Sequence, residues 1–209
     1  MILMKKLPDI TALLRPYVPP AAVAYCADLA LLHNLQLQVS RPRRSKWGDY
    51  RFRKREGTIT HSITVNNNLN PYAFLITYLH EVAHCAAFVK HGLRIKPHGR
   101  EWKVHFAKLL APVLDEKIFP QDVLTPLRRY SRNPKAATGS DGALTLALQQ
   151  HDVISEEVPL SHLAPNARFE FRQRTYIKKK VRRTRSLCQE ESTDVHYLIL
   201  ETTLVRRLP

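Results

Sequence analysis

One long apolar segment with two histidines four residues apart constrains this chain more than any other feature. Residues 70–92 read NPYAFLITYLHEVAHCAAFVKHG, with Asn70 placed to cap a helix, Pro71 at its first position and Gly92 at its end. We expect one long helix that lies in the core. Its histidines and its glutamate would then be buried, and buried polar groups are costly unless they have partners. A metal ion would be such a partner.

The polar residues of this segment form the pattern HExxH. Residues four apart share one face of a helix, so His80 and His84 can present ring nitrogens to a single ion. Glu81 is offset from His80 by about 100° at 3.6 residues per turn. It can therefore lie beside the metal without binding it, as a general base acting on water does. The spacing predicts one catalytic Zn²⁺ ion.

A catalytic zinc usually has three protein ligands and keeps a fourth position for water. Three downstream residues could supply the third ligand: His98, Glu101 and His105. We rank them in that order. Pro97 and Gly99 bracket His98 in a predicted turn just before the next helix, which suits a ligand that reaches back towards the first helix.

The segment HEVAHCAAF followed by HGREW resembles the SprT-like zinc metalloprotease family, whose signature is HExxH and a later HGxxF/W. WGDYRF and ITVNNNLNPYAFLITYLHEVAH are similar to the strand and helix that precede the site in bacterial members. The resemblance covers roughly residues 10–130. It implies that His80, His84 and His98 are the zinc ligands and that Glu81 is the catalytic acid and base.

The expected fold class is α+β. Alternating segments between residues 35 and 66 predict three antiparallel strands, which would pack on helices as a zincin-like SprT domain over residues 1–130. We expect a linker with a short helix at 131–155 and a small, basic, β-rich module at 156–209. Many SprT-like proteins carry a C-terminal zinc ribbon with paired CxxC motifs. This tail has only Cys188, so we expect no ribbon.

The chain is strongly basic, with 33 Lys and Arg against 18 Asp and Glu and a formal charge of +15. Such a balance attracts polyanions. Residues 41–55 and 168–185 mix cations with aromatics, which could neutralise phosphates and stack on bases. The candidate nucleic-acid contacts are Arg43, Arg44, Lys46, Arg51, Arg53, Lys178, Lys179, Lys180, Arg182 and Arg183.

Cysteine usage and the N-terminus bear on location. The three cysteines form no CxxC pair, which favours a reducing compartment. The N-terminus lacks the apolar region of a signal peptide, and we find no run of about 18 apolar residues that would cross a membrane. We expect a cytoplasmic protein with no membrane partner.

These patterns favour a zinc metalloendopeptidase that hydrolyses protein or peptide substrates. The basic charge and the family resemblance point to a DNA-associated enzyme acting on DNA-bound or DNA-crosslinked proteins. Two alternatives are a nucleic-acid-binding protein with a structural or silent zinc site, and a general cytoplasmic metallopeptidase independent of DNA. We also expect the strand at 58–66 to offer a sheet edge to an extended substrate.

Overall fold

The computed structural model contains two compact units, residues 1–148 and 149–209, each with its own hydrophobic core. The residues it describes are 9–43, 46–136, 138–152 and 156–209. The N-terminal segment 1–8, on which the expected lack of a signal peptide partly rests, lies outside these ranges, as does the candidate contact Arg44. The α+β prediction is confirmed.

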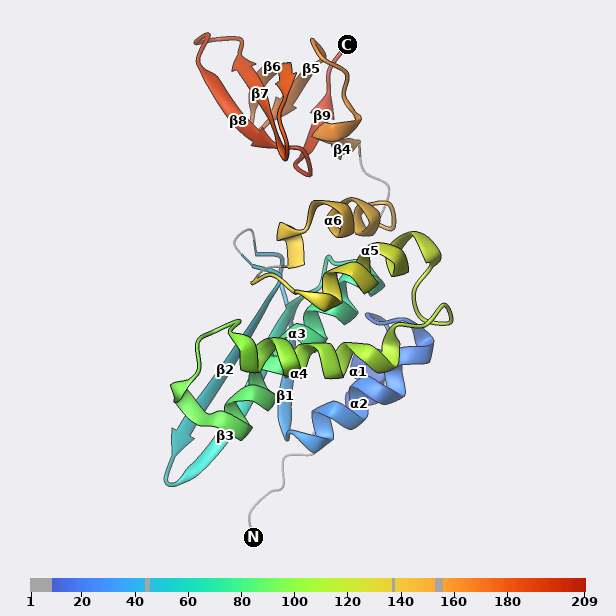
Figure 1. Ribbon diagram of the computed structural model, residues 1–209, viewed down its shortest axis with the longest axis vertical. Helices are drawn as coiled ribbons and strands as arrows, with labels where there is room; N and C mark the ends of the chain where they lie inside the picture. Colours follow the sequence, from blue (N-terminus) through green and yellow to red (C-terminus); the bar gives the residue numbers. More distant parts are fainter. Residues whose placement is uncertain (1–8, 44–45, 137, 153–155) are drawn as a thin grey trace. The chain divides into compact units, whose positions relative to one another are not determined.

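The first unit combines helices with a three-stranded sheet (Figure 1). Its helices are α1 (Ile10–Leu14), α2 (Val23–Leu32), α3 (Pro71–His91), α4 (Arg100–Leu110), α5 (Gln121–Arg132) and α6 (Gly142–Gln149). Its strands are β1 (Leu35–Ser40), β2 (Gly48–Arg55) and β3 (Thr58–Asn66). Helix α3 packs against β2 and β3, and α4 packs against α3.

The sheet is mixed, with the order β1-β3-β2. Strands β2 and β3 form an antiparallel hairpin whose turn, Glu56 and Gly57, has positive φ at both residues. Strand β1, however, runs parallel to β3. The prediction of an all-antiparallel sheet was therefore wrong. The alternation of apolar and polar residues shows which side chains share a face of the sheet, but it does not show the direction of a strand. After β1 the chain continues to β2 on the opposite side of β3, and β1 and β3 are therefore parallel.

The same order places β3 in the centre of the sheet. Its backbone is paired with β1 on one side and with β2 on the other. The expectation that residues 58–66 offer a free edge to a substrate was therefore wrong. Strand β2 is an edge strand of the sheet, next to β3. Residues 51–60 of the β2–β3 hairpin are exposed.

Helix α3 forms the centre of the first unit. The Asn70 side chain accepts hydrogen bonds from the backbone N–H groups of Tyr72 and Ala73, and the helix ends at Gly92, which has a φ of 68°. This is the capping that the sequence predicted. The helix and the turn after it are long and apolar enough to span a membrane by length and composition, but 78% of the apolar window is buried in the protein. Burial within the domain accounts for its apolar character.

Helix α6 belongs to the core of the first unit. Leu144 and Leu148 are buried in that core, and the Asn70 side-chain amide donates to the carbonyl oxygen of Leu148 at 2.8 Å. The short helix expected within residues 131–155 is present. The border between the two compact units falls at the end of this helix, between Leu148 and Gln149, whereas the sequence analysis ended the first domain at residue 130.

The second unit is a six-stranded antiparallel sheet of order β4-β9-β5-β6-β7-β8. Its strands are β4 (Glu157–Pro159), β5 (Arg168–Phe171), β6 (Arg174–Val181), β7 (Arg185–Glu190), β8 (His196–Leu200) and β9 (Leu204–Arg207). Its core is small and includes Phe169, Tyr176 and the free thiol Cys188. With so few apolar residues buried, each polar group in this core matters for the stability of the unit.

Candidate metal centre and basic surfaces

Two elements bring the three histidines together. Helix α3 carries His80 and His84 one turn apart on the same face, and His80 is only 6% exposed. His98 lies in the turn before α4 with a φ of 58°, in the left-handed region. Non-glycine residues adopt this region infrequently, and histidine does so more readily than most. The turn thereby directs the His98 ring back towards α3.

The three Nε2 atoms form a close triangle. The distances are 3.0 Å between His80 and His98, 3.0 Å between His84 and His98, and 3.2 Å between His80 and His84. Of the three residues considered for the third position, the structure brings only His98 to this point. Glu101 is not part of the group, and the His105 ring lies 5.8 Å from the ring of His91.

The donor set fits a zinc ion. Burial, with the neighbouring rings, lowers the pKa of His80 to about 2 and that of His84 to about 4. Burial also lowers the pKa of His98. The rings are therefore neutral near pH 7, and each can offer a nitrogen lone pair. A tetrahedral ion with Zn–N bonds of about 2.0–2.1 Å requires ligand nitrogens roughly 3.3 Å apart, close to the observed spacing.

Aromatic residues of α4 pack against this triangle. The Trp102 ring centroid lies 4.6 Å from that of His80, 4.8 Å from His98 and 5.4 Å from His84. Trp102 and Phe106 are fully buried, and the Trp102 indole N–H donates to the backbone carbonyl of His80 at 3.3 Å. An apolar surround of this kind strengthens electrostatic interactions within the site.

Glu81 lies beside the triangle but is not one of its members. Its side chain is 6% exposed, and burial, with the charge of Asp49, raises the pKa of its carboxyl to about 8. The charges of Lys46 and Arg43 and a hydrogen bond with the Tyr50 backbone act in the opposite direction. A carboxyl group poised in this way can take up and release a proton near neutral pH.

Gly48 is a site residue that the sequence reasoning missed. A Cβ atom at this position would lie 2.8 Å from Glu81 Cγ and 2.8 Å from Thr77 Cγ2, well inside normal contact distance. Only glycine lets β2 pass this close to the Glu81 side chain. A signal did exist in the sequence, because GDYRF places a glycine at an inward position whose neighbours along the strand are aromatic.

The inward side chains of β2 contact successive turns of α3. These side chains are those opposite the buried His61, Ile63 and Val65 of β3. The pairs along this face are Gly48 with Glu81, Tyr50 with His84, and Phe52 with Phe88. The Tyr50 hydroxyl is also within 2.9 Å of His61 Nδ1. This packing sets β2 against the HExxH face of the helix.

The basic stretch 41–55 divides between the two faces of the sheet. Arg51, Arg53 and Arg55 pair with Ser62, Thr60 and Thr58 and lie on the solvent face. Among the candidate nucleic-acid contacts, Arg53 is exposed. Lys46 Nζ and Arg51 Nε each form an ion pair with the Asp49 carboxylate, with N–O distances of 2.7 Å. The half-buried Arg43 donates to Asn66 Oδ1 and Thr64 Oγ1. Trp47 and Tyr50 pack against the core, so base stacking by these two rings is not supported. Phe52 stacks on Phe88 with ring centroids 4.2 Å apart but is 36% exposed.

In the basic stretch 168–185, one of the predicted nucleic-acid contacts, Lys178, is buried. Lys178 is 1% exposed, and its ammonium group donates to the carbonyl oxygens of Leu160 and Leu163 and pairs with Glu201 at 3.2 Å. The prediction that Lys178 contacts nucleic acid was therefore wrong. It shares the core-facing side of β6 with Tyr176, and a run of lysines does not reveal which member faces inward.

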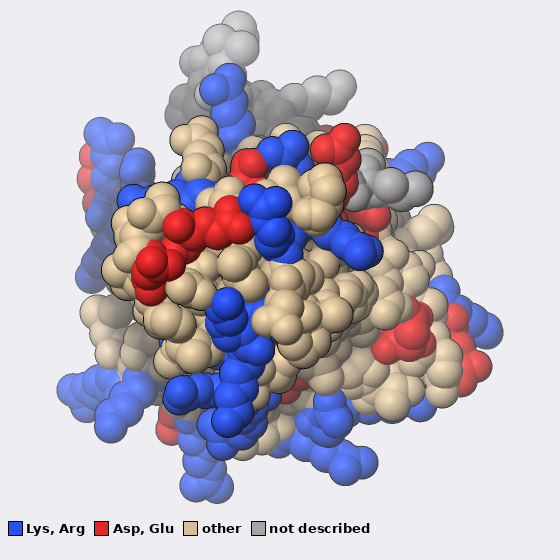
Figure 2. Space-filling model, turned by 90° about the horizontal axis from the view of Figure 1, so that it is seen from above, with Lys and Arg blue, Asp and Glu red and all other residues tan. Residues whose placement is uncertain are grey.

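The other candidates in this stretch are more accessible. Lys179 is half-buried, and Lys180, Arg182 and Arg183 are exposed. Most of the excess positive charge lies elsewhere, however, because residues 1–148 carry 22 Lys and Arg against 10 Asp and Glu. In the second unit, Arg168, Arg174 and Arg206 each pair with a glutamate. On the face displayed in Figure 2, acidic side chains lie between basic ones.

Comparison with known families finds a similarity in the first unit. The model of the SprT-like family matches residues 24–118, slightly less than half of the chain. Over these residues the chain is similar to the SprT-like family. The match runs from α2 to the segment after α4 and includes all three histidines and Glu81. No curated protein and no solved structure matches the chain.

Proposed function

We propose that this protein is a zinc-dependent metalloendopeptidase in which His80, His84 and His98 hold one Zn²⁺ ion. The observation that carries the proposal is the triangle of neutral ring nitrogens with the buried Glu81 carboxyl beside it. A purely structural zinc site would tend to use four protein ligands and would not need this glutamate. The SprT-like family match supports the same class of enzyme.

Zinc bound to these histidines supplies a Lewis acid that activates water and polarises a scissile carbonyl. Glu81 accepts a proton from the attacking water and delivers it to the leaving amine. Positioned proton transfer of this kind contributes roughly 10² to 10⁴ in rate. Trp102 and Phe106 are fully buried and pack against the histidine rings, and Gly48 leaves room for the Glu81 side chain.

An extended substrate would bind along β2. This strand is an edge of the sheet, and it lies against the helix that carries Glu81. A peptide added as a further strand gains main-chain hydrogen bonds without regard to sequence, while neighbouring pockets select its side chains. We therefore assign to β2 the role that the sequence suggested for residues 58–66.

Association with DNA is the second part of the proposal, with DNA-bound or DNA-crosslinked proteins as substrates. Arg51, Arg53 and Arg55 form an exposed row on the solvent face of the sheet, within the unit that carries most of the net charge. Arginine and lysine neutralise phosphates and release counterions, so binding weakens steeply as salt rises. The alternatives are a peptidase indifferent to DNA and a nucleic-acid-binding protein with a silent zinc site.

Cleavage of a DNA-binding protein by the zinc-loaded enzyme, with and without single-stranded DNA, tests both parts. Glu81→Gln is the matched control, and bound zinc is measured for both proteins. Turnover that requires Glu81 and rises with DNA supports the full proposal. Turnover that requires Glu81 but ignores DNA leaves a plain metallopeptidase. No turnover with zinc and DNA both bound favours the binding protein.

A further inference from the structure

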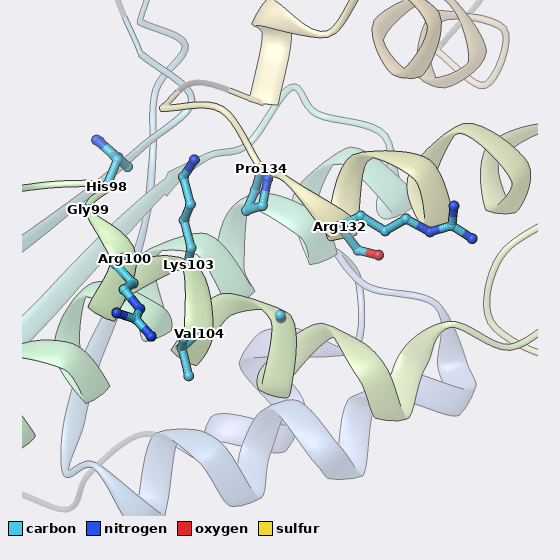
Figure 3. Close-up of a pocket in the computed structure, with 9 residues that line it drawn as sticks. His98, Gly99, Arg100, Lys103, Val104, Arg132 and Pro134 are labelled. Carbon is cyan, nitrogen blue, oxygen red and sulfur yellow. The ribbon is translucent and has the colours of Figure 1, made fainter.

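A pocket of about 440 Å³ adjoins the candidate metal centre. His98 forms part of its wall, and the rest comes from the first turns of α4 and from the segment at the end of α5 (Figure 3). Because His98 belongs to both features, a group held in the pocket lies next to a peptide bond positioned at the histidines. The volume falls within the roughly 300–1,000 Å³ of typical ligand sites.

The charged residues that line this pocket are all basic. Lys103, Arg100 and Arg132 line it, and no acidic residue does. In Figure 3 the Lys103 side chain stands between His98 and Pro134, while the guanidinium groups of Arg100 and Arg132 are turned away from it.

No carboxylate compensates these charges. None of the three cations forms an ion pair within the part of the chain that the structure describes. Lys103 Nζ instead donates to the neutral Asn133 Oδ1 at 2.6 Å. Its ammonium group therefore keeps donors for an anionic partner.

The walls of the pocket also have apolar parts. Val104, Ala107 and Pro134 line it together with the cations. A carboxylate on a short hydrocarbon stem would place its methylene groups against these walls and its charge near Lys103. This combination suits an acidic amino-acid side chain better than a bare phosphate. A nucleic-acid strand in this position would also lie across the histidine face and compete with the peptide.

We infer that this pocket selects an aspartate or glutamate of the substrate, close to the scissile bond. The inference rests on the proposed peptidase function and names the side chain that the enzyme prefers there. Lys103 is the residue that determines this preference, and Arg100 and Arg132 supply additional positive charge at the rim.

The first test compares cleavage of peptides that differ only in having Glu, Gln or Lys at each position around the cleaved bond. We expect kcat/KM for the best Glu peptide to exceed that for its Lys counterpart on the order of tenfold, as for a hydrogen bond to a charged group. Lys103→Glu should reverse the order. Lys108→Glu, which makes the same change on an exposed site of α4 outside the pocket, should leave it unchanged. Equal preference in the native protein and Lys103→Glu would overturn the inference.

The second test needs no turnover. Binding of fluorescent Glu and Gln peptides is measured on Glu81→Gln, alone and combined with Lys103→Glu or with Lys103→Met, which keeps the length of the side chain. Selective loss of Glu-peptide affinity, about tenfold, with both Lys103 changes supports the inference. Oligothymidylate that displaces the Glu peptide and depends on Lys103 would reassign the pocket to phosphate and overturn it. Lys103-dependent peptide binding without cleavage by any zinc-loaded protein would overturn the peptidase proposal and leave the acidic-peptide site standing.

Discussion

Glu81 in the first unit and Lys178 in the second are both buried ionisable residues, and their surroundings are opposite. Lys178 in the second unit is surrounded by acceptors, namely two backbone carbonyls and the carboxylate of Glu201. Glu81 in the first unit has a raised pKa, because burial outweighs the groups that would stabilise its charge. A buried charge with a full set of partners stabilises a fold, whereas one left with few partners beside a ligand triangle is poised for proton transfer.

The largest expected effect comes from removing the proton carrier. Glu81→Gln keeps the size of the side chain and should lower kcat by about 10² to 10⁴. Zinc content and the unfolding temperature should remain at or above native values, because a neutral amide is easier to bury than a carboxylate. Steady-state peptide cleavage and thermal unfolding measure the two quantities. A variant that retains full activity would remove the distinction between the two buried charges.

Removing the buried cation should act on stability instead. Lys178→Met removes the ammonium group from the Glu201 carboxylate, which keeps its hydrogen bond from the Ser186 hydroxyl. The change should cost about 3–5 kcal/mol of the second unit's unfolding free energy. Denaturant unfolding of the full chain measures this, with Lys179→Met as the neighbouring control on the same strand. Zinc binding by the first unit should persist. An equal effect of both substitutions would show that the internal bonds of Lys178 add nothing.

The close approach of β2 to Glu81 gives a third prediction. Gly48→Ala places a methyl group against Glu81 and Thr77, and crowding of this kind costs about 1–3 kcal/mol. We expect a lower unfolding temperature together with reduced kcat, because the Glu81 carboxyl must move. Gly57→Ala, in the hairpin turn where nothing lies near a Cβ, should lower stability through its positive φ but leave kcat intact. Loss of kcat in both variants would contradict the specific role of Gly48.

The metal-free protein should show the raised pKa of Glu81 as a pH dependence of stability. The folded state keeps the proton up to about pH 8, whereas the free side chain has a value of 4.5. Its contribution is therefore fully present below the lower value and is lost as pH rises through the higher one. The lowered pKa values of His80, His84 and His98 act in the opposite direction, but they do so in both chains. Measured with a chelator between these pH values, the unfolding free energy of the native chain relative to that of Glu81→Gln should therefore fall as pH rises. Identical slopes would contradict the assignment.

The smallest effects concern the two basic stretches. Replacing Arg51, Arg53 and Arg55 by serine should weaken binding to single-stranded DNA and lower the salt slope by about 0.7 for each phosphate that the variant no longer neutralises. The matched change in the second unit, at Lys180, Arg182 and Arg183, should weaken it less, because acidic residues neutralise more of that unit's charge. Fluorescence anisotropy at several salt concentrations compares them. A larger loss from the second set would place DNA binding in the second unit.

The parts of the site that lie within one helix could be predicted from the sequence. Asn70, Pro71 and Gly92 mark the ends of α3, and the spacing of His80, Glu81 and His84 follows from helical periodicity alone. His98 remained one of three candidates. Its selection depends on a left-handed turn and on how α4 packs against α3, which are not local properties of the chain.

Other outcomes were decided by tertiary structure. Alternation predicted the strands between residues 35 and 66, but the neighbours and direction of β1 depend on which strand fills the centre of the sheet. In the second unit, the packing of the small core turned Lys178 inward among adjacent lysines. Local periodicity determines where elements form and which residues share a face. Long-range packing determines which face is buried and which residues meet, because those contacts join segments far apart in the chain.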